Sequence, residues 1–269
     1  MFFELDSSEY HKVLPLYLKE EKIFPLILAV IRCKQRGWVF VDDAIQPTMA
    51  IILNNFGFIQ SVGVDDLDDW VTNFFKSSHS SIPPYILWYF PSPKTQAILN
   101  SLNSNYIRRR ERVRFIFTKP TINDCLIECP TGFSIVHLDE ELITKTVSLG
   151  LDINSRFWES TKDFLRNGIS VCVLRKGEIV SLCYSACIVD KLTETDVFTK
   201  ENYRKMGFAA IASQSFIAEC IQQGIMPTWD CFVSNTASMK LAGSLGFEQN
   251  ITYPFYSFNV SAILKETSL

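Results

Sequence analysis

The stretch Tyr203-Arg204-Lys205-Met206-Gly207-Phe208-Ala209 is a basic turn that opens directly into an amphipathic helical pattern over 209–221. A helix N-terminus has backbone N–H groups without intrahelical partners and carries partial positive charge, so it can bind a phosphate largely through its main chain. Gly207 lets the backbone approach phosphate oxygens or adopt a positive φ, and the Arg204 guanidinium matches phosphate geometry. A strand pattern over 196–199 precedes the turn. This order of strand, glycine turn and helix suits a nucleotide-like cofactor.

Two common phosphate motifs are missing from the sequence. The P-loop requires G-x-x-x-x-G-K-[ST] and the dinucleotide fingerprint requires G-x-G-x-x-G, and neither spacing occurs among the eleven glycines. This argues against nucleoside triphosphates and NAD. The pattern that is present, Arg204-x-x-Gly207-x-Ala209, resembles the R/Q-x-x-G-x-G/A signature of the Gcn5-related N-acetyltransferase (GNAT) superfamily.

A second segment, NTASMKLAGSLGF over 235–247, resembles the N-x-x-[AS]-x-x-L-x-x-x-x-G-F segment of the same superfamily. Asn235 is a favourable helix N-cap, and Gly246 stands where a C′ residue ends a helix. The two motifs together are far more specific than either alone. Trp229-Asp230-Cys231 and the residues around it look most similar to the zwittermicin-resistance type of acetyltransferase, a two-domain bacterial subfamily.

The order of the predicted elements is the order that the GNAT fold requires. In the second half we expect helices over 140–149 and 156–167, strands over 169–174, 179–189 and 195–199, then helix 209–221, strand 228–233, helix 235–245 and strand 251–258. The first half predicts helices over 9–18, 22–32, 66–75 and 94–102, and strands over 37–41, 48–54, 85–90 and 113–117. We therefore predict an α/β (α+β) protein. A smaller α/β domain, 1–119, would shape the acceptor pocket, and a GNAT domain, 120–269, would have a mixed, mostly antiparallel sheet flanked by helices.

Composition limits the classes of partner. The net charge of −3 gives no global attraction to nucleic acid or to an anionic membrane. The basic run over 108–114 is the local exception: we expect a solvated connector there, with RNA or ribosome contact as the alternative. The N-terminal MFFELD lacks the basic region of a signal peptide, and the apolar run over 23–31 is far shorter than the ~20 residues of a membrane helix. We predict a cytoplasmic protein with no membrane or nucleic-acid partner, and the oligomeric state stays open.

The eight cysteines show no C-x-x-C units and no nearby histidine cluster, so no metal site is predicted. We expect buried, reduced thiols, which suit a reducing compartment. The sequence has only three histidines, at 11, 79 and 137, so few residues are available for a histidine-centred catalytic triad.

The GNAT resemblance implies acetyl-coenzyme A as the cosubstrate. Its pantetheine would lie along the strand Val197-Phe198-Thr199, pairing with the strand's backbone. Backbone amides from Lys205 to Ala210 would bind the pyrophosphate, and the Asn235 side chain would contact the cofactor arm. The implied cofactor-binding residues are Val197, Phe198, Thr199, Arg204, Lys205, Met206, Gly207, Phe208, Ala209, Ala210 and Asn235.

The reaction implied by the resemblance is direct attack of a primary amine on the thioester. Holding the two reactants together supplies much of the rate, and a base need only remove the ammonium proton. Glu194 and Asp196, beside the cofactor strand, are the candidate bases. Many family members place a tyrosine, which protonates the leaving thiolate, where this chain has Ala242. Tyr256 and Tyr184 are candidates for that role, and unassisted departure of the thiolate is the alternative.

The favoured hypothesis is an N-acetyltransferase that acts on a small-molecule amine. A coenzyme A-binding sensor or scaffold without transfer activity is the second, because of Ala242 and the lack of an evident base.

Overall fold

The computed structural model describes residues 3–20, 23–63, 74, 82–101, 106–118 and 127–261. The chain forms two compact units, the first of Met1–Arg112 with Tyr253–Leu269 and the second of Val113–Thr252. The predicted boundary at Lys119-Pro120 and nearly all of the predicted helix over 66–75 lie outside the described residues. The domain assignment of 1–119 and 120–269 stays a prediction.

The second unit is built on a mixed sheet with the strand order β6-β11-β10-β9-β8-β7. β7 to β10 are joined by antiparallel pairing, whereas β10 and β11 are parallel. The turn between β8 and β9 has positive φ at both Lys176 and Gly177, as tight hairpins of this twist require. The strands are β6 Ile107–Phe117, β7 Ser134–Val136, β8 Ser170–Arg175, β9 Glu178–Val189, β10 Leu192–Thr199, β11 Met226–Phe232 and β12 Phe247–Asn259.

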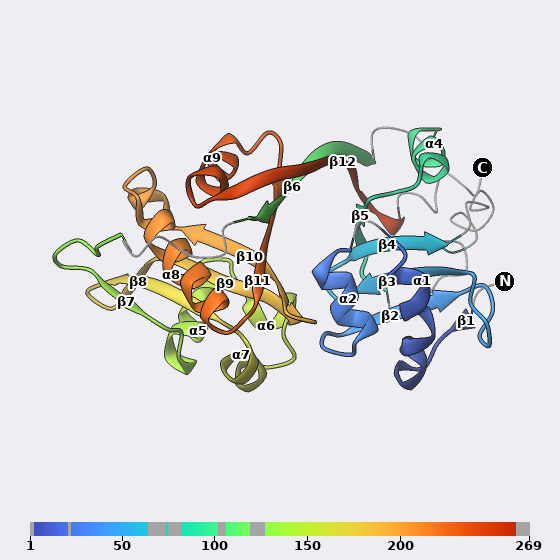
Figure 1. The fold of residues 1–269 in the computed structure, drawn as a ribbon, viewed down its shortest axis with the longest axis horizontal. Helices are drawn as coiled ribbons and strands as arrows, with labels where there is room; N and C mark the ends of the chain where they lie inside the picture. Colours follow the sequence, from blue (N-terminus) through green and yellow to red (C-terminus); the bar gives the residue numbers. More distant parts are fainter. Residues whose placement is uncertain are drawn as a thin grey trace. The chain divides into compact units, whose positions relative to one another are not determined.

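Helices cover both faces of this sheet (Figure 1). Alternate residues of a strand point to opposite faces, so Cys183 packs in the cluster under α8 (Phe208–Gln222), whereas Tyr184 packs in the cluster under α5–α7. The other helices are α5 Glu140–Ser148, α6 Ile153–Arg156, α7 Thr161–Asn167 and α9 Thr236–Ser244, with the 3-10 turn η2 Glu201–Tyr203. This alternation fixes which face each polar side chain of β10 and β11 occupies.

The first unit repeats the strand topology of the second. Its order is β1-β2-β3-β4-β5-β12, antiparallel from β1 to β4 and parallel between β4 and β5. The C-terminal part of β12 pairs antiparallel with β5. The elements are β1 Phe3–Glu4, η1 Ser7–Val13, α1 Leu14–Tyr17, α2 Pro25–Ile31, β2 Gly37–Val41, β3 Met49–Asn54, β4 Phe58–Gly63, β5 Tyr85–Tyr89 and α4 Pro93–Ser101. The sequence shows no repeat period, because the two halves share a topology and not a residue pattern.

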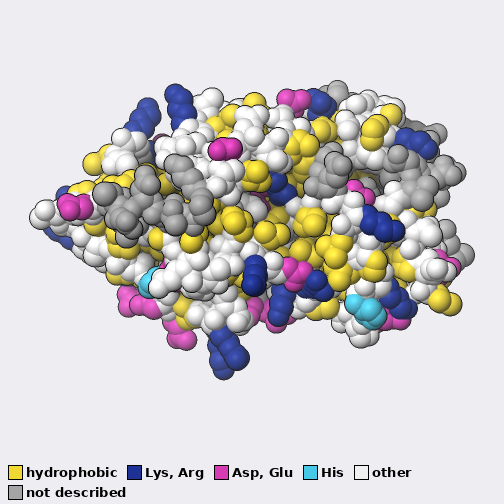
Figure 2. Space-filling model, in the orientation of Figure 1, with side chains coloured by type: hydrophobic (Ala, Val, Ile, Leu, Met, Phe, Trp, Pro, Cys, Tyr) yellow, Lys and Arg dark blue, Asp and Glu magenta, His cyan; other side chains and the backbone are white. Residues whose placement is uncertain are grey.

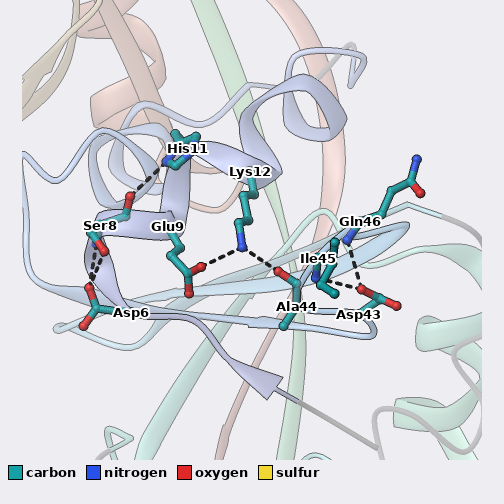
Figure 3. A network of polar contacts seen from close by, with 9 residues as sticks. All are labelled: Asp6, Ser8, Glu9, His11, Lys12, Asp43, Ala44, Ile45 and Gln46. Atoms are coloured by element: carbon teal, nitrogen blue, oxygen red, sulfur yellow. Dashed lines mark hydrogen bonds and ion pairs between the residues drawn. The ribbon is translucent and has the colours of Figure 1, made fainter.

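The loop between β2 and β3 is fixed by polar contacts (Figure 3). Lys12 Nζ lies 2.6 Å from Glu9 Oε1 and donates to the Ala44 carbonyl at 2.7 Å. Asp43 Oδ1 accepts from the backbone N–H groups of Ile45 and Gln46. The loop is therefore attached to η1 by one lysine.

The predicted α/β class and the mixed, mostly antiparallel sheet flanked by helices are confirmed. Three short strands, β1, β4 and β7, were not predicted. Of the helix expected over 156–167, only 161–167 is the helix α7, and Arg156 is instead the last residue of α6. A new helix begins because Ser160 Oγ caps α7 by accepting a hydrogen bond from the Asp163 backbone N–H.

The connector predicted for the arginine run is wrong, because 107–117 is the continuous strand β6. Its arginines include three whose contacts are as follows. Arg109 pairs with Glu111 at 3.5 Å, Arg112 lies over the Phe255 ring, and Arg114 forms a buried ion pair with Asp230. Basic and acidic side chains are also interspersed on the visible face of the molecule (Figure 2).

Candidate active site

A pocket of about 620 Å³ lies between β10 and β11 at the N-terminal end of α8. The parallel pairing of the two strands covers only Leu192–Glu194 on β10, although β10 continues to Thr199. Beyond Glu194, this edge of β10 has no strand partner among the described residues, so its backbone groups can pair with an extended ligand. The lining residues are Val197, Phe198, Thr199, Tyr203, Arg204, Lys205, Gly207, Phe208, Ala209, Ala210, Trp229, Asn235, Ala237, Ser238 and Leu241.

The turn before α8 has the backbone shape of an anion site. Lys205 and Gly207 both have left-handed backbone conformations, with φ of 63° and 85°. Gly207 is the N-cap of α8 and supplies no side chain, so the N–H groups of the first turn stay available to a ligand. Arg204 is held against the turn by a hydrogen bond from its Nε to the Thr199 carbonyl at 3.3 Å. Positive charge and free amides therefore meet at one end of the pocket.

The predicted cofactor-binding residues come together around this pocket, with Met206 as the exception. Met206 is 57% exposed and is not among the lining residues. Asn235 Oδ1 accepts from the Ser238 backbone N–H at 3.1 Å and so caps α9, which leaves its amide N–H₂ group as a donor.

Five lining residues were not predicted as cofactor contacts: Tyr203, Trp229, Ala237, Ser238 and Leu241. The indole Nε1 of Trp229 donates to Ser238 Oγ at 3.0 Å, which ties β11 to α9 across the pocket wall. Ser238 and Leu241 are defined positions of the motif over 235–247, and Tyr203 begins the basic turn, so the sequence offered a signal for these three. No such pattern marks Trp229 or Ala237 as lining residues.

Glu194, one candidate base, is buried, with 6% of its surface exposed. The Thr228 hydroxyl lies 2.6 Å from Glu194 Oε2 and also 3.0 Å from the Thr193 carbonyl. Glu194 therefore lies where the parallel pairing ends, enclosed by its neighbours.

Asp196, the other candidate base, is more open. Its side chain is 37% exposed, and its Oδ2 accepts a hydrogen bond of 2.6 Å from the Tyr184 hydroxyl. Burial, together with the charge of Asp196, raises the pKa of Tyr184 well above its usual value, so this hydroxyl stays protonated and remains a donor. Arg156, at the end of α6, brings Nη1 to 3.8 Å from Asp196 Oδ2. Asp196 is thus held in place and yet reaches solvent.

Tyr256 belongs to the first unit. It is fully buried in that unit's core, and its hydroxyl donates to Asn100 Oδ1 at 3.0 Å. It is not among the pocket-lining residues. Ala242 is fully buried in α9.

The carboxylates of Asp196 on β10 and Asp230 on β11 share one face of the sheet. Val197, Trp229 and Cys231 pack in the cluster under α8, so by strand alternation Asp196 and Asp230 face the α5–α7 side. Asp230 is paired with Arg114 there, through contacts of 2.8 and 2.6 Å.

The described cysteines are free thiols, and Cys125 lies outside the described residues. Burial raises the pKa of Cys172 to about 12, whereas Cys33 is exposed, contrary to the expectation of buried thiols. In the described part of the chain, no group of three His, Cys, Asp or Glu side chains could hold a metal ion. Among the same residues, no helix is both long and apolar enough to cross a membrane.

Comparisons with known proteins agree with this architecture. A profile of the family described as GNAT acetyltransferase matches residues 18–256. A curated relative from Bacillus subtilis (strain 168), named Uncharacterized N-acetyltransferase YdfB, is 25% identical over 257 residues, which cover 94% of this chain and 97% of the relative.

Two solved structures show the same fold. A GCN5-related N-acetyltransferase-like protein from Streptococcus suis 89/1591 has a TM-score of 0.74 and 22% identity, over 94% of this chain and 99% of that chain. A tandem GNAT protein from the clavulanic acid biosynthesis pathway has a TM-score of 0.66 and 10% identity, over 97% of this chain and 98% of that chain. Because the family profile spans most of its length, the chain belongs to the GNAT acetyltransferase family and is an acyltransferase that carries out acetyl transfer.

Proposed function

We propose that the protein transfers acetyl from acetyl-coenzyme A to a primary amine of a small molecule. The observation that carries the proposal is the pocket in which the free edge of β10 meets the uncapped N-terminus of α8. The pantetheine amides would pair with the backbone of Val197–Thr199, and the pyrophosphate would accept hydrogen bonds from the amides of Lys205–Ala210. Acetyl-coenzyme A is the donor that GNAT acetyltransferases generally use.

Asp196 is the base that this geometry favours. Its carboxylate takes a proton from the ammonium group, directly or through water, and the amine nitrogen then attacks the thioester carbonyl carbon. The C–N bond forms as the C–S bond breaks. The nitrogen then gives up its second proton and the thiolate takes up one proton, so the products are the acetamide and the coenzyme A thiol. Glu194 is less exposed and serves less readily, since a base must come within hydrogen-bond reach of the acceptor.

Isothermal titration with acetyl-coenzyme A tests the donor. Gly207→Glu places a carboxylate where the pyrophosphate would bind, and we expect it to abolish binding. Gly177→Glu is the matched control, because Gly177 also has a positive φ and open space where a Cβ would be added, but lies in the β8–β9 turn away from the pocket. Absence of binding by the unaltered protein, or equal binding by Gly207→Glu, would reject the proposal.

The match to the zwittermicin-resistance subfamily and the cytoplasmic location stay predictions.

A further inference from the structure

Two arginine–aspartate pairs lie on the polar face of the second unit, and they differ in kind. Arg114 makes two contacts, of 2.8 and 2.6 Å, with Asp230 Oδ2, and these side chains are 9% and 0% exposed. Arg156 comes no closer than 3.8 Å to Asp196 Oδ2, and these side chains are 29% and 37% exposed. A separation of 3.8 Å is beyond hydrogen-bond distance. The first pair is buried and directly hydrogen-bonded. The second pair, Arg156 and Asp196, is partly exposed to solvent and is called the open pair below.

Each member of the open pair is held by other groups. The buried Tyr184 hydroxyl donates to Asp196 at 2.6 Å, and Arg156 also interacts with this hydroxyl. Arg156 is the last residue of α6, and the N-cap of this helix, Asp152, accepts a hydrogen bond from the Ser155 backbone N–H. The Arg156 guanidinium lies 5.8 Å from the centre of the Phe157 ring. Opposite charges are thus held 3.8 Å apart at a partly exposed position, an arrangement preorganised for a ligand.

The open pair also lies beside the reaction centre that the proposed function implies. Asp196 precedes Val197, which lines the cofactor pocket, and β10 has left β11 at this point. An amine bound to Asp196 would therefore approach a thioester between the strands from the α5–α7 face.

We propose that the acceptor is a zwitterion, whose ammonium group binds Asp196 and whose carboxylate binds Arg156. A simple cationic amine on Asp196 would lie close to the Arg156 guanidinium and would be repelled by it. A carboxylate on the same molecule removes this repulsion and matches the guanidinium fork, which binds carboxylates in a bidentate manner. The inference names the acceptor class and rests on the proposed transfer reaction.

The test compares matched acceptors: a panel of α- and β-amino acids and the carboxamide of each, with coenzyme A thiol release as the readout. For the unaltered enzyme we expect kcat/KM to favour the best amino acid over its carboxamide by about 10-fold to 100-fold. Arg156→Gln should remove that preference, by raising KM for the amino acid and, because the repelling guanidinium charge is gone, by raising kcat/KM for the carboxamide.

Arg166→Gln is the control, because Arg166 is an exposed arginine on the neighbouring helix α7, and it should keep the preference. Equal use of both acceptor types by the unaltered enzyme, or an equal loss for both in Arg156→Gln, would overturn the inference. Titration of every variant with acetyl-coenzyme A distinguishes failure of the acceptor inference from failure of the proposed function. A protein that binds the donor but acetylates no member of the panel contradicts the zwitterionic acceptor, whereas one that does not bind the donor contradicts the proposed function.

Discussion

At the residue scale, two glycines of the second unit have open space around them but differ in backbone conformation. A Cβ added at Gly207 or at Gly243 would meet no atom within 4 Å. Gly207 has a φ of 85°, which L-residues rarely adopt, whereas Gly243 lies inside helix α9. Because only the conformation differs, substitutions at these two positions distinguish the effect of the glycine backbone conformation from the effect of its small size.

We therefore expect Gly207→Ala to lower the free energy of unfolding by roughly 1–2 kcal/mol, because alanine is strained at positive φ. Gly243→Ala should raise it by about 0.5–1 kcal/mol, because alanine loses less backbone entropy in a helix. Urea denaturation followed by circular dichroism measures both. Shifts of the same sign in the two variants would contradict this account of the turn.

At the element scale, the short helices over the polar face depend on side-chain caps. Asp152 caps α6 and Ser160 caps α7, each by accepting a backbone N–H. Hydrogen bonds from the Ser155 backbone N–H and then the Ser155 hydroxyl hold the pKa of Asp152 below its usual value of 3.8. A lowered pKa in the folded state stabilises the fold above pH ~4, and this contribution is lost as pH falls through the folded-state pKa.

Asp152→Ala should accordingly cost about 1 kcal/mol at pH 7 and progressively less below pH ~4. Ser160→Ala removes an uncharged cap, so its cost should stay constant over the same range. Denaturation curves at pH 7, 5, 4 and 3 give both values. A cost for Asp152→Ala that does not change with pH would show that the carboxylate charge has no part in the cap.

The cofactor side of the site was predictable because its signals are local. The turn Arg204 to Gly207 is contiguous with the helix after it, and the Asn235 cap opens a second motif whose residues are also neighbours in sequence. The acceptor side was not predictable to the same degree. Asp196 lies opposite Tyr184 only because β9 carries one extra residue between Ser185 and Cys187, and Arg156 arrives from a separate helix. Such pairings depend on register and packing, which one sequence does not show.

At the scale of the whole molecule, the first unit has the topology of the second but fills the corresponding place with its own side chains. Its parallel pairing ends at Ile59 and Trp88. Just beyond, Gln60 Oε1 accepts from the Tyr17 hydroxyl at 2.9 Å, and Phe24 stacks on Tyr89 with ring centres 3.7 Å apart.

We thus expect one acetyl-coenzyme A per chain. Isothermal titration should give a stoichiometry of one for the unaltered protein, and no residual site in Gly207→Glu. A stoichiometry of two, or a weak site that survives in Gly207→Glu, would show that the first unit also binds the cosubstrate.

The strands β6 and β12 each begin in one unit and end in the other, since the units divide at Arg112 and at Thr252. A gene truncated to either half would therefore encode a protein that lacks part of a strand and exposes a sheet edge prone to aggregation. An intact protein therefore requires that both halves be encoded in one chain.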